Sequence, residues 1–82
     1  MDKLLEDYRN AFVEAFELED TSQLSELKYQ SIEEWDSIGH MALMAELETQ
    51  FAITIKTEDL IQFESYIQGV DILARYDIII NL

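Results

Sequence analysis

Ser37 is the residue of this 82-residue sequence whose type and position most clearly suit chemistry. It follows Asp36 and begins a stretch with helical periodicity, so its hydroxyl is expected at a helix N-terminus. A phosphodiester is well tolerated there, because the N–H dipoles of the first turn point toward it. Asp and Ser are also ordinary helix caps, however, and the Asp36-Ser37 pair alone is weak evidence of function.

Other reactive side chains are scarce. With no cysteine and a single histidine, His40, the sequence offers no disulfide, thiolate site or histidine cluster, and we expect no metal centre. A hydrolase built on Ser37 and His40 would need an orienting group and an oxyanion site, and neither can be proposed for two residues so close on one helix. His40 falls on the inward side of this helix, so we interpret it as a packed, hydrogen-bonded core residue and expect no enzymatic activity.

Four helices are predicted to position Ser37, which makes the chain all-α. Apolar residues recur at three- and four-residue spacing in the first, second and last of them, and the third is brief. The predicted helices span about residues 3–17, 37–51, 57–62 and 65–76. A chain of this length supports one hydrophobic core, so residues 1–82 are expected to form a single domain.

The connections between these helices carry signals of their own. Residues 19–36 lack helical periodicity and are predicted to form a long loop held down by scattered apolar side chains, and such loops are often functional. Thr57 is expected to cap the third helix, whose first turn is acidic. Ser65 and Gln68 have the spacing of a capping box at the start of the last helix.

The helix that begins at Ser37 has two apolar arcs. One arc is predicted to face the core and the other to be exposed, which assigns Met44 to the core and Met41 to the surface. The inward stripes of the first two helices give the predicted core, namely Phe12, Phe16, Leu43, Leu47 and Phe51. The outward arc and two nearby acidic residues are expected to contact partner proteins; they are Ile38, Met41, Ala45, Glu46 and Glu48.

Charge narrows the range of partners. The chain has 18 acidic and 5 basic residues and a formal net charge of −13. The phosphates of nucleic acids and anionic membranes would repel it, whereas basic protein surfaces would attract it. A hydrophobic content of 49% separates it from disordered acidic tails. Six acidic residues could line a docking face or simply be solvated: Glu33, Glu34, Glu46, Glu48, Glu58 and Asp59.

The two ends of the chain give expectations about location. The N-terminal residues MDKLLEDYRN lack a basic segment followed by an apolar stretch, and no run approaches the roughly 20 apolar residues that span a bilayer. We therefore expect a cytoplasmic monomer without membrane insertion. The apolar tail, residues 77–82, could dock a partner, add to the core or fray.

A longer pattern surrounds Ser37. It runs Trp35-Asp36-Ser37-Ile38-Gly39-His40-Met41, followed by Leu43, Leu47-Glu48, Phe51, Ile53 and Ile55. These residues resemble the signature of the acyl carrier protein family, an Asp-Ser-[Leu/Ile] start and a leucine-rich helix that ends in Phe-x-Ile-x-[Ile/Phe]. The resemblance implies an acyl-carrier-like four-helix bundle, with a long loop between the first two helices and a short third helix.

The resemblance also implies a function for Ser37. A separate phosphopantetheinyl transferase would move 4'-phosphopantetheine from coenzyme A to the Ser37 hydroxyl, with Asp36 as part of the attachment site. The thiol of this arm would carry acyl or aminoacyl cargo as a thioester. Partner enzymes with basic docking surfaces would load, modify and unload that cargo, and the carrier would supply position.

Several positions indicate which branch of the acyl carrier protein family the chain resembles. Peptidyl carriers usually have Gly-Gly where this chain has Glu34-Trp35, and fatty-acid carriers often have acidic residues at the positions of Gly39 and Ala42. A free-standing carrier of a specialised biosynthetic pathway is therefore favoured. One alternative of a different class stays open: an acidic helical adaptor that binds a basic protein without a prosthetic group.

Overall fold

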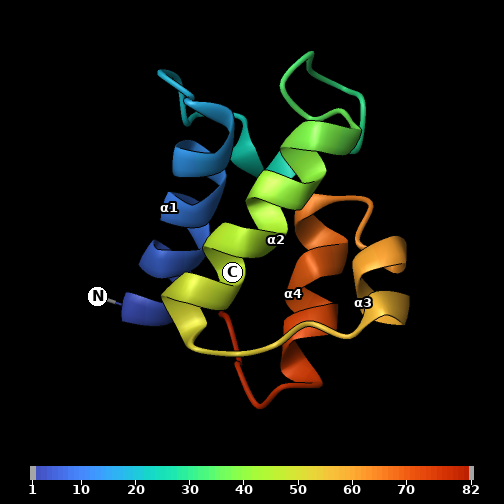
Figure 1. Cartoon of the computed structure of the whole chain (residues 1–82). Coiled ribbons are helices and arrows are strands. Elements are labelled where there is room, and N and C mark those ends of the chain that lie inside the picture. The colour runs from blue at the N-terminus through green and yellow to red at the C-terminus, as the bar shows by residue number, and fades with distance from the viewer. Residues whose placement is uncertain (1, 82) are drawn as a thin grey trace.

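The computed structural model describes residues 2–81, which contain four α-helices and no β-strand. The helices are α1 (Lys3–Phe16), α2 (Ser37–Phe51), α3 (Thr57–Gln62) and α4 (Tyr66–Ala74), and a short 3₁₀-helix, η1 (Leu24–Glu26), lies between α1 and α2. The predicted all-α class is confirmed, and α2 and α3 have the predicted bounds. In Figure 1, α1 and α4 lie on either side of α2, and α3 lies at the outer edge beyond α4.

Helix α1 is amphipathic and is capped at both ends. Asp2 Oδ1 accepts hydrogen bonds from the backbone N–H groups of Leu4 and Leu5 at 3.0 and 3.3 Å. The helix ends one residue before the predicted position, because Glu17 adopts the left-handed conformation (φ 52°) that commonly terminates helices. Its inward face buries Tyr8, Ala11, Phe12 and Phe16.

Aromatic rings form the centre of the core. Tyr8, Phe12, Phe16, Trp35, Phe63 and Tyr66 are each at most 2% exposed. An added Cβ at Gly69 of α4 would collide with the Tyr8 hydroxyl and the Phe63 ring, so only glycine allows this approach. The Tyr8 hydroxyl donates a hydrogen bond to the Tyr66 carbonyl at 2.6 Å, and burial raises the pKa of Tyr8. These contacts fix α1 against the start of α4.

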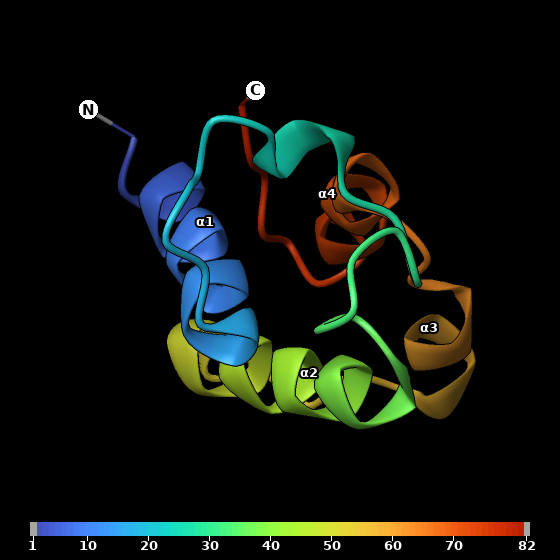
Figure 2. The ribbon, with the colours of Figure 1, turned by 90° about the horizontal axis from the view of Figure 1, so that it is seen from above.

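The connection from α1 to α2 is long, as predicted, and it is fastened to α4. Figure 2 shows the chain leaving α1, passing α4 as η1 and returning to α2. The Tyr29 N–H donates to the Glu64 carbonyl at 2.8 Å, and the Tyr66 N–H donates to the Leu27 carbonyl at 3.0 Å. Near the end of the connection, Trp35 is completely buried. These contacts fix the end of the loop directly before Asp36 and Ser37.

Helices α3 and α4 begin differently. The prediction that Thr57 caps α3 is wrong: Lys56 is the cap residue, its carbonyl accepts the first hydrogen bond, and no side chain caps this helix. At α4, Ser65 Oγ accepts from the Gln68 N–H at 3.0 Å, as predicted. Gln68 Oε1 accepts from the Glu64 N–H at 3.2 Å, so the reciprocal bond of a complete capping box is replaced by one to the preceding residue.

The C-terminal tail contributes to the core. Helix α4 ends at Ala74, before the predicted residue 76, and the chain continues without helical structure. Ile78 and Ile80 are 8% and 6% exposed, whereas Ile79 between them is 57% exposed. Of the three roles that the sequence left open, addition to the core is the one that the described part of the tail shows. Leu82, its last residue, lies outside the described residues.

Four of the five predicted core residues are fully inside. Phe12, Phe16, Leu43 and Leu47 are at most 2% exposed. The prediction for Phe51 is wrong, because its ring is only partly buried and packs against the edge of the core. Phe51 is the last residue of α2, and the chain turns away at Ala52, which has a left-handed conformation (φ 53°).

Candidate functional site

Ser37 occupies the first turn of α2 and is exposed to solvent. Asp36 caps this helix, because its Oδ1 accepts a hydrogen bond from the Gly39 N–H at 2.8 Å. The backbone of Asp36 also accepts from the His40 N–H at 2.8 Å. Asp36 thus fills the capping role, and the Ser37 hydroxyl is presented at the surface beside a helix N-terminus.

His40 lies one turn after Ser37 and links Trp35 to α3. The indole Nε1–H of Trp35 donates to His40 Nδ1 at 3.0 Å, and His40 Nε2 lies 2.8 Å from the Leu60 carbonyl oxygen. An acceptor at Nδ1 and a donor at Nε2 define the neutral ring with its proton on Nε2. His40 uses both nitrogens, so the predicted hydrogen bonding is confirmed, but the residue is only partly buried and is not part of the buried core.

Gly39 has a steric role in this turn. Its Cα faces the backbone carbonyl of Glu34, and an added Cβ would collide with that oxygen. Glycine therefore allows the end of the loop to pass close to the first turn of α2. This approach brings Asp36 into position to cap the helix. Ser37 follows as the first residue of α2 and is exposed to solvent.

A cleft of about 380 Å³ opens beside Ser37. Tyr29, Ser37, His40, Met41, Leu60, Ile61, Phe63 and Glu64 line it. These residues come from the long connection, the first turns of α2, and α3 with the segment that follows it. Ser37 is the only residue of this lining that offers an alcohol at the start of a helix, so a group attached there would have a largely apolar cleft next to it.

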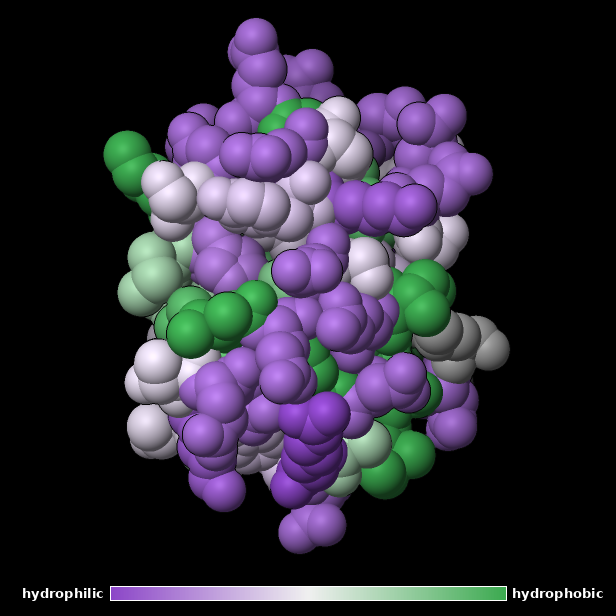
Figure 3. Space-filling view, turned by 90° about the vertical axis from the view of Figure 1, so that its right-hand side faces the viewer, coloured by the Kyte–Doolittle hydropathy of each residue, from purple (hydrophilic) through white to green (hydrophobic). Residues whose placement is uncertain are grey.

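The outward face of α2 is apolar near Ser37. Ile38 is 80% and Met41 is 55% exposed, and Ala45 is exposed on the same side. On α3, Ile61 is 67% exposed. Figure 3, which shows the α3 side of the molecule, has hydrophilic side chains over most of the surface and hydrophobic ones in separate patches. The predicted exposure of Ile38, Met41 and Ala45 is confirmed, and their contact with partners stays a prediction.

The two acidic residues predicted for the docking surface are less exposed than the apolar ones. Glu46 and Glu48 are both partly buried. Glu48 Oε2 accepts a hydrogen bond from the Ile55 N–H at 2.8 Å, which holds the segment after α2 against the helix. Glu48 therefore has a structural role that the sequence pattern did not indicate.

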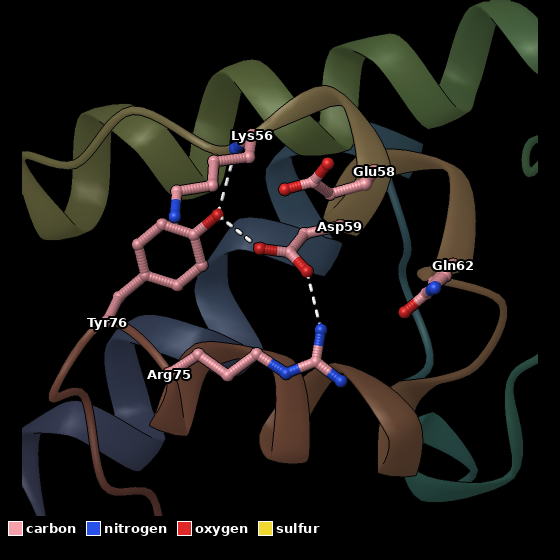
Figure 4. Close-up of a pocket in the computed structure, with 6 residues that line it drawn as sticks. All are labelled: Lys56, Glu58, Asp59, Gln62, Arg75 and Tyr76. Atoms are coloured by element: carbon pink, nitrogen blue, oxygen red, sulfur yellow. Dashed lines mark hydrogen bonds and ion pairs between the residues drawn. The ribbon is translucent and has the colours of Figure 1, made fainter.

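Asp59 is the clearest correction to the predicted acidic face, because its carboxylate is buried rather than solvated. Asp59 is 5% exposed, and it joins α3 to the end of α4 (Figure 4). Asp59 Oδ2 accepts from the Tyr76 hydroxyl at 2.6 Å, Oδ1 pairs with the Arg75 guanidinium at 2.5 Å, and the Tyr76 oxygen accepts from the Lys56 N–H at 2.8 Å. The Tyr76 hydrogen bond, together with Arg75, holds the pKa of Asp59 below its usual range.

The surroundings of Asp59 form a second hollow, of about 440 Å³. Lys56, Glu58, Asp59, Gln62, Arg75 and Tyr76 line it, and Figure 4 shows these side chains around the opening. The Asp59 carboxylate and the Tyr76 hydroxyl are occupied by their mutual contacts. We interpret this cluster as a structural attachment of α3.

Within residues 2–81, the His, Asp and Glu side chains form no group of three or more that could hold a metal ion. Within the same range, every helix is too short or too polar to cross a membrane.

Comparisons with protein-family models, with curated proteins and with solved structures gave no match.

Besides the role of Glu48, sequence reasoning missed three features of this region. It did not find the contact between Trp35 and His40, the link from His40 to Leu60, or the burial of Asp59. The first had a usable signal, because the only tryptophan precedes a histidine by five residues, and a buried indole N–H needs an acceptor. The other two depend on residues far apart in sequence, and no local pattern indicates them.

Proposed function

We propose that this chain is a carrier protein of the acyl-carrier type, in which Ser37 bears a 4'-phosphopantetheine arm and the arm holds acyl or aminoacyl cargo as a thioester. In support of the proposal, the described chain has four helices, a long connection before α2 and a six-residue α3. The observation that carries the proposal is the exposed Ser37 hydroxyl, at the start of α2 and beside the apolar cleft. The signature residues around it agree with this assignment.

The attachment is a phosphoryl transfer to the serine oxygen. Ser37 Oγ forms a new bond to the β-phosphorus of coenzyme A, the bond from that phosphorus to the nucleotide breaks, and adenosine 3',5'-bisphosphate leaves. The hydroxyl proton passes to a base of the transferase. The carrier contributes an accessible nucleophile and a helix N-terminus, which favours the phosphodiester that results.

The residues present are compatible with such an arm. The cleft lining contains no lysine or arginine, both ring nitrogens of His40 are engaged, and the charged neighbours Asp36 and Glu64 are acidic, so this lining would not retain a free phosphate. A covalent bond to Ser37 supplies the retention instead. Met41, Leu60, Ile61 and Phe63 would cover part of the arm or of its cargo with apolar surface.

The position of His40 supports a carrier over a serine hydrolase. Both of its ring nitrogens are engaged, one by the Trp35 indole and the other by the Leu60 carbonyl. No nitrogen is left to deprotonate Ser37, which a hydrolytic pair would require. In this proposal partner enzymes perform the chemistry, and Ser37 is an acceptor rather than a catalyst.

The surface around Ser37 suits recognition by basic partner enzymes. Ile38 and Met41 would give apolar contacts at the centre, while Glu46 and Glu48 would attract a basic rim. The formal net charge of −13 acts in the same direction over a longer range. Because Gly39 and Ala42 replace acidic residues that are common in fatty-acid carriers, we place the chain in a specialised biosynthetic pathway, in the cytoplasm.

Mass spectrometry of the intact protein tests the proposal. The chain is incubated with coenzyme A and a broad-specificity phosphopantetheinyl transferase, and a parallel sample lacks the transferase. A carrier gains the mass of one arm in the first sample alone. The alternative, an acidic adaptor that uses its charge to bind a basic protein, gains nothing in either sample, and this result would contradict the carrier proposal.

A further inference from the structure

The imidazole of His40 joins three separate segments of the chain near Ser37. Trp35 comes from the long connection, His40 from α2 and Leu60 from α3, and the two hydrogen bonds of His40 measure 3.0 and 2.8 Å. The imidazole and indole rings are nearly coplanar, with 15° between their planes and 6.2 Å between their centres, as expected for a hydrogen bond between ring nitrogens. His40 lines the same cleft as Ser37. Its side chain is thus the polar link between the helix that presents Ser37 and the helix on the far side of the cleft.

Helix α3 depends on such links because it has little stability of its own. It has six residues and no side-chain cap, and isolated helices of this length do not persist in water. Figure 2 shows it at the edge of the bundle. Two polar attachments hold it: Asp59 to the end of α4, and Leu60 to His40. Only the second faces Ser37.

We propose that His40 is a positioning residue of the carrier site, and that its contact with the Leu60 carbonyl holds α3 beside the first turn of α2. Ser37, Met41 and Ile61 then meet a partner enzyme as one preformed surface. The inference rests on the proposed function, since it concerns how the transferase reaches Ser37. A preformed surface spares the partner the entropy of ordering α3, so the benefit appears in KM and not in kcat.

Two amide substitutions separate the two hydrogen bonds of His40. In His40→Asn, the side-chain oxygen lies near the place of Nδ1 and still accepts from Trp35, but the side chain is too short to reach Leu60. In His40→Gln, the longer side chain places an N–H near the position of Nε2 and still donates to the Leu60 carbonyl. The variants therefore share their chemistry and differ in which partner they keep.

The variant with the larger expected change in KM is the one expected to be more stable. Arm transfer to His40→Asn should show a KM for the carrier raised about five- to tenfold, as expected for loss of one hydrogen bond, with kcat unchanged. His40→Gln should keep KM within about twofold of wild type. It should nevertheless unfold more readily than His40→Asn, because the buried Trp35 N–H has lost its acceptor. Fluorescence of Trp35, the only tryptophan, should change in His40→Gln and less in His40→Asn.

The reverse order would overturn the inference. If KM rises most in the less stable His40→Gln, or stays at the wild-type value in a folded His40→Asn, His40 is a core residue without a positioning role. If His40→Asn does not fold, hydrogen exchange in His40→Gln decides: α3 amides that are as protected relative to α4 as in wild type support the link, and selectively faster α3 exchange overturns it. A wild-type chain that gains no arm contradicts the proposed function itself, which distinguishes the two failures.

Discussion

Helix α2 carries one methionine on each face, which allows the two faces to be compared directly. Met44 is 2% exposed and Met41 is 55% exposed, although they are three positions apart in one helix. In α3 the neighbours Glu58 and Asp59 repeat the contrast, since Glu58 is exposed and Asp59 is buried. Residue type therefore does not decide whether a side chain is buried in the fold or exposed at the surface. The direction in which the backbone places it does.

The largest expected effect is the difference in stability between the two methionine substitutions. Met44→Ala should lower the free energy of unfolding by about 2–5 kcal/mol, because it removes a buried side chain and leaves a cavity. Met41→Ala should change it by less than about 0.5 kcal/mol. Chemical denaturation of both variants measures the difference. Equal losses would show that the two faces are not distinct.

A smaller loss of stability is expected when Asp59, the buried member of the acidic pair in α3, is replaced. At neutral pH, Asp59→Asn should cost about 1.5–3 kcal/mol, the usual value for hydrogen bonds to a charged group, while Glu58→Gln should have almost no effect. The pKa of Asp59 is lowered in the folded protein, so its contribution is present above the unfolded pKa of about 4 and is lost as pH falls through the folded value. The stability gap between wild type and Asp59→Asn should therefore shrink on acidification. A gap that is constant from pH 7 to pH 2 would contradict this account.

The outward face should instead affect recognition. Met41→Ala should raise the KM of arm transfer about fivefold, as expected when roughly 1 kcal/mol of apolar contact is lost, at both low and high salt. Met41 lies in the lining of the cleft beside Ser37, where the proposed transferase would approach. Kinetics with circular dichroism as a folding control measure this effect. Wild-type kinetics in the folded variant would move the docking surface elsewhere.

The smallest effect is expected at Glu48. Glu48→Gln retains an oxygen for the Ile55 N–H, so its fold should be intact, but the charge is removed. Association with a basic partner should slow about two- to threefold at low salt and less at high salt, because ions screen the attraction. Glu48→Ala is the control for the structural role, since it also loses the hydrogen bond. A salt-independent effect of Glu48→Gln would argue against electrostatic steering.

The sequence predicted those parts of the fold that depend on local periodicity. Helix α2 was predicted with its observed bounds, and Leu43, Met44 and Leu47 were assigned correctly to its inward face. Helical spacing suffices for this, because each turn repeats the same direction. Phe51 was expected deeper in the core than it lies, because the same spacing continues to the end of the helix, where only the edge of the core remains.

The sequence could not predict contacts between distant residues. Asp59 was expected to be exposed, either in a docking face or as solvated charge, and its partners Arg75 and Tyr76 are 16 and 17 residues away. The close approach of the Glu34 carbonyl to Gly39 likewise follows from the path of an irregular loop. At the candidate site, Asp36 and Ser37 were found from sequence, whereas the geometry of His40 required the structure.

The central claim is that Ser37 is the attachment site, and a matched pair of serine substitutions tests it most directly. Ser25 in η1 is also exposed, but it lies outside the helix N-terminus and the cleft that distinguish Ser37. After incubation with coenzyme A and the transferase, the intact mass of Ser25→Ala should increase by one phosphopantetheine, while Ser37→Ala should stay at its unmodified mass. An arm on Ser37→Ala would contradict the account.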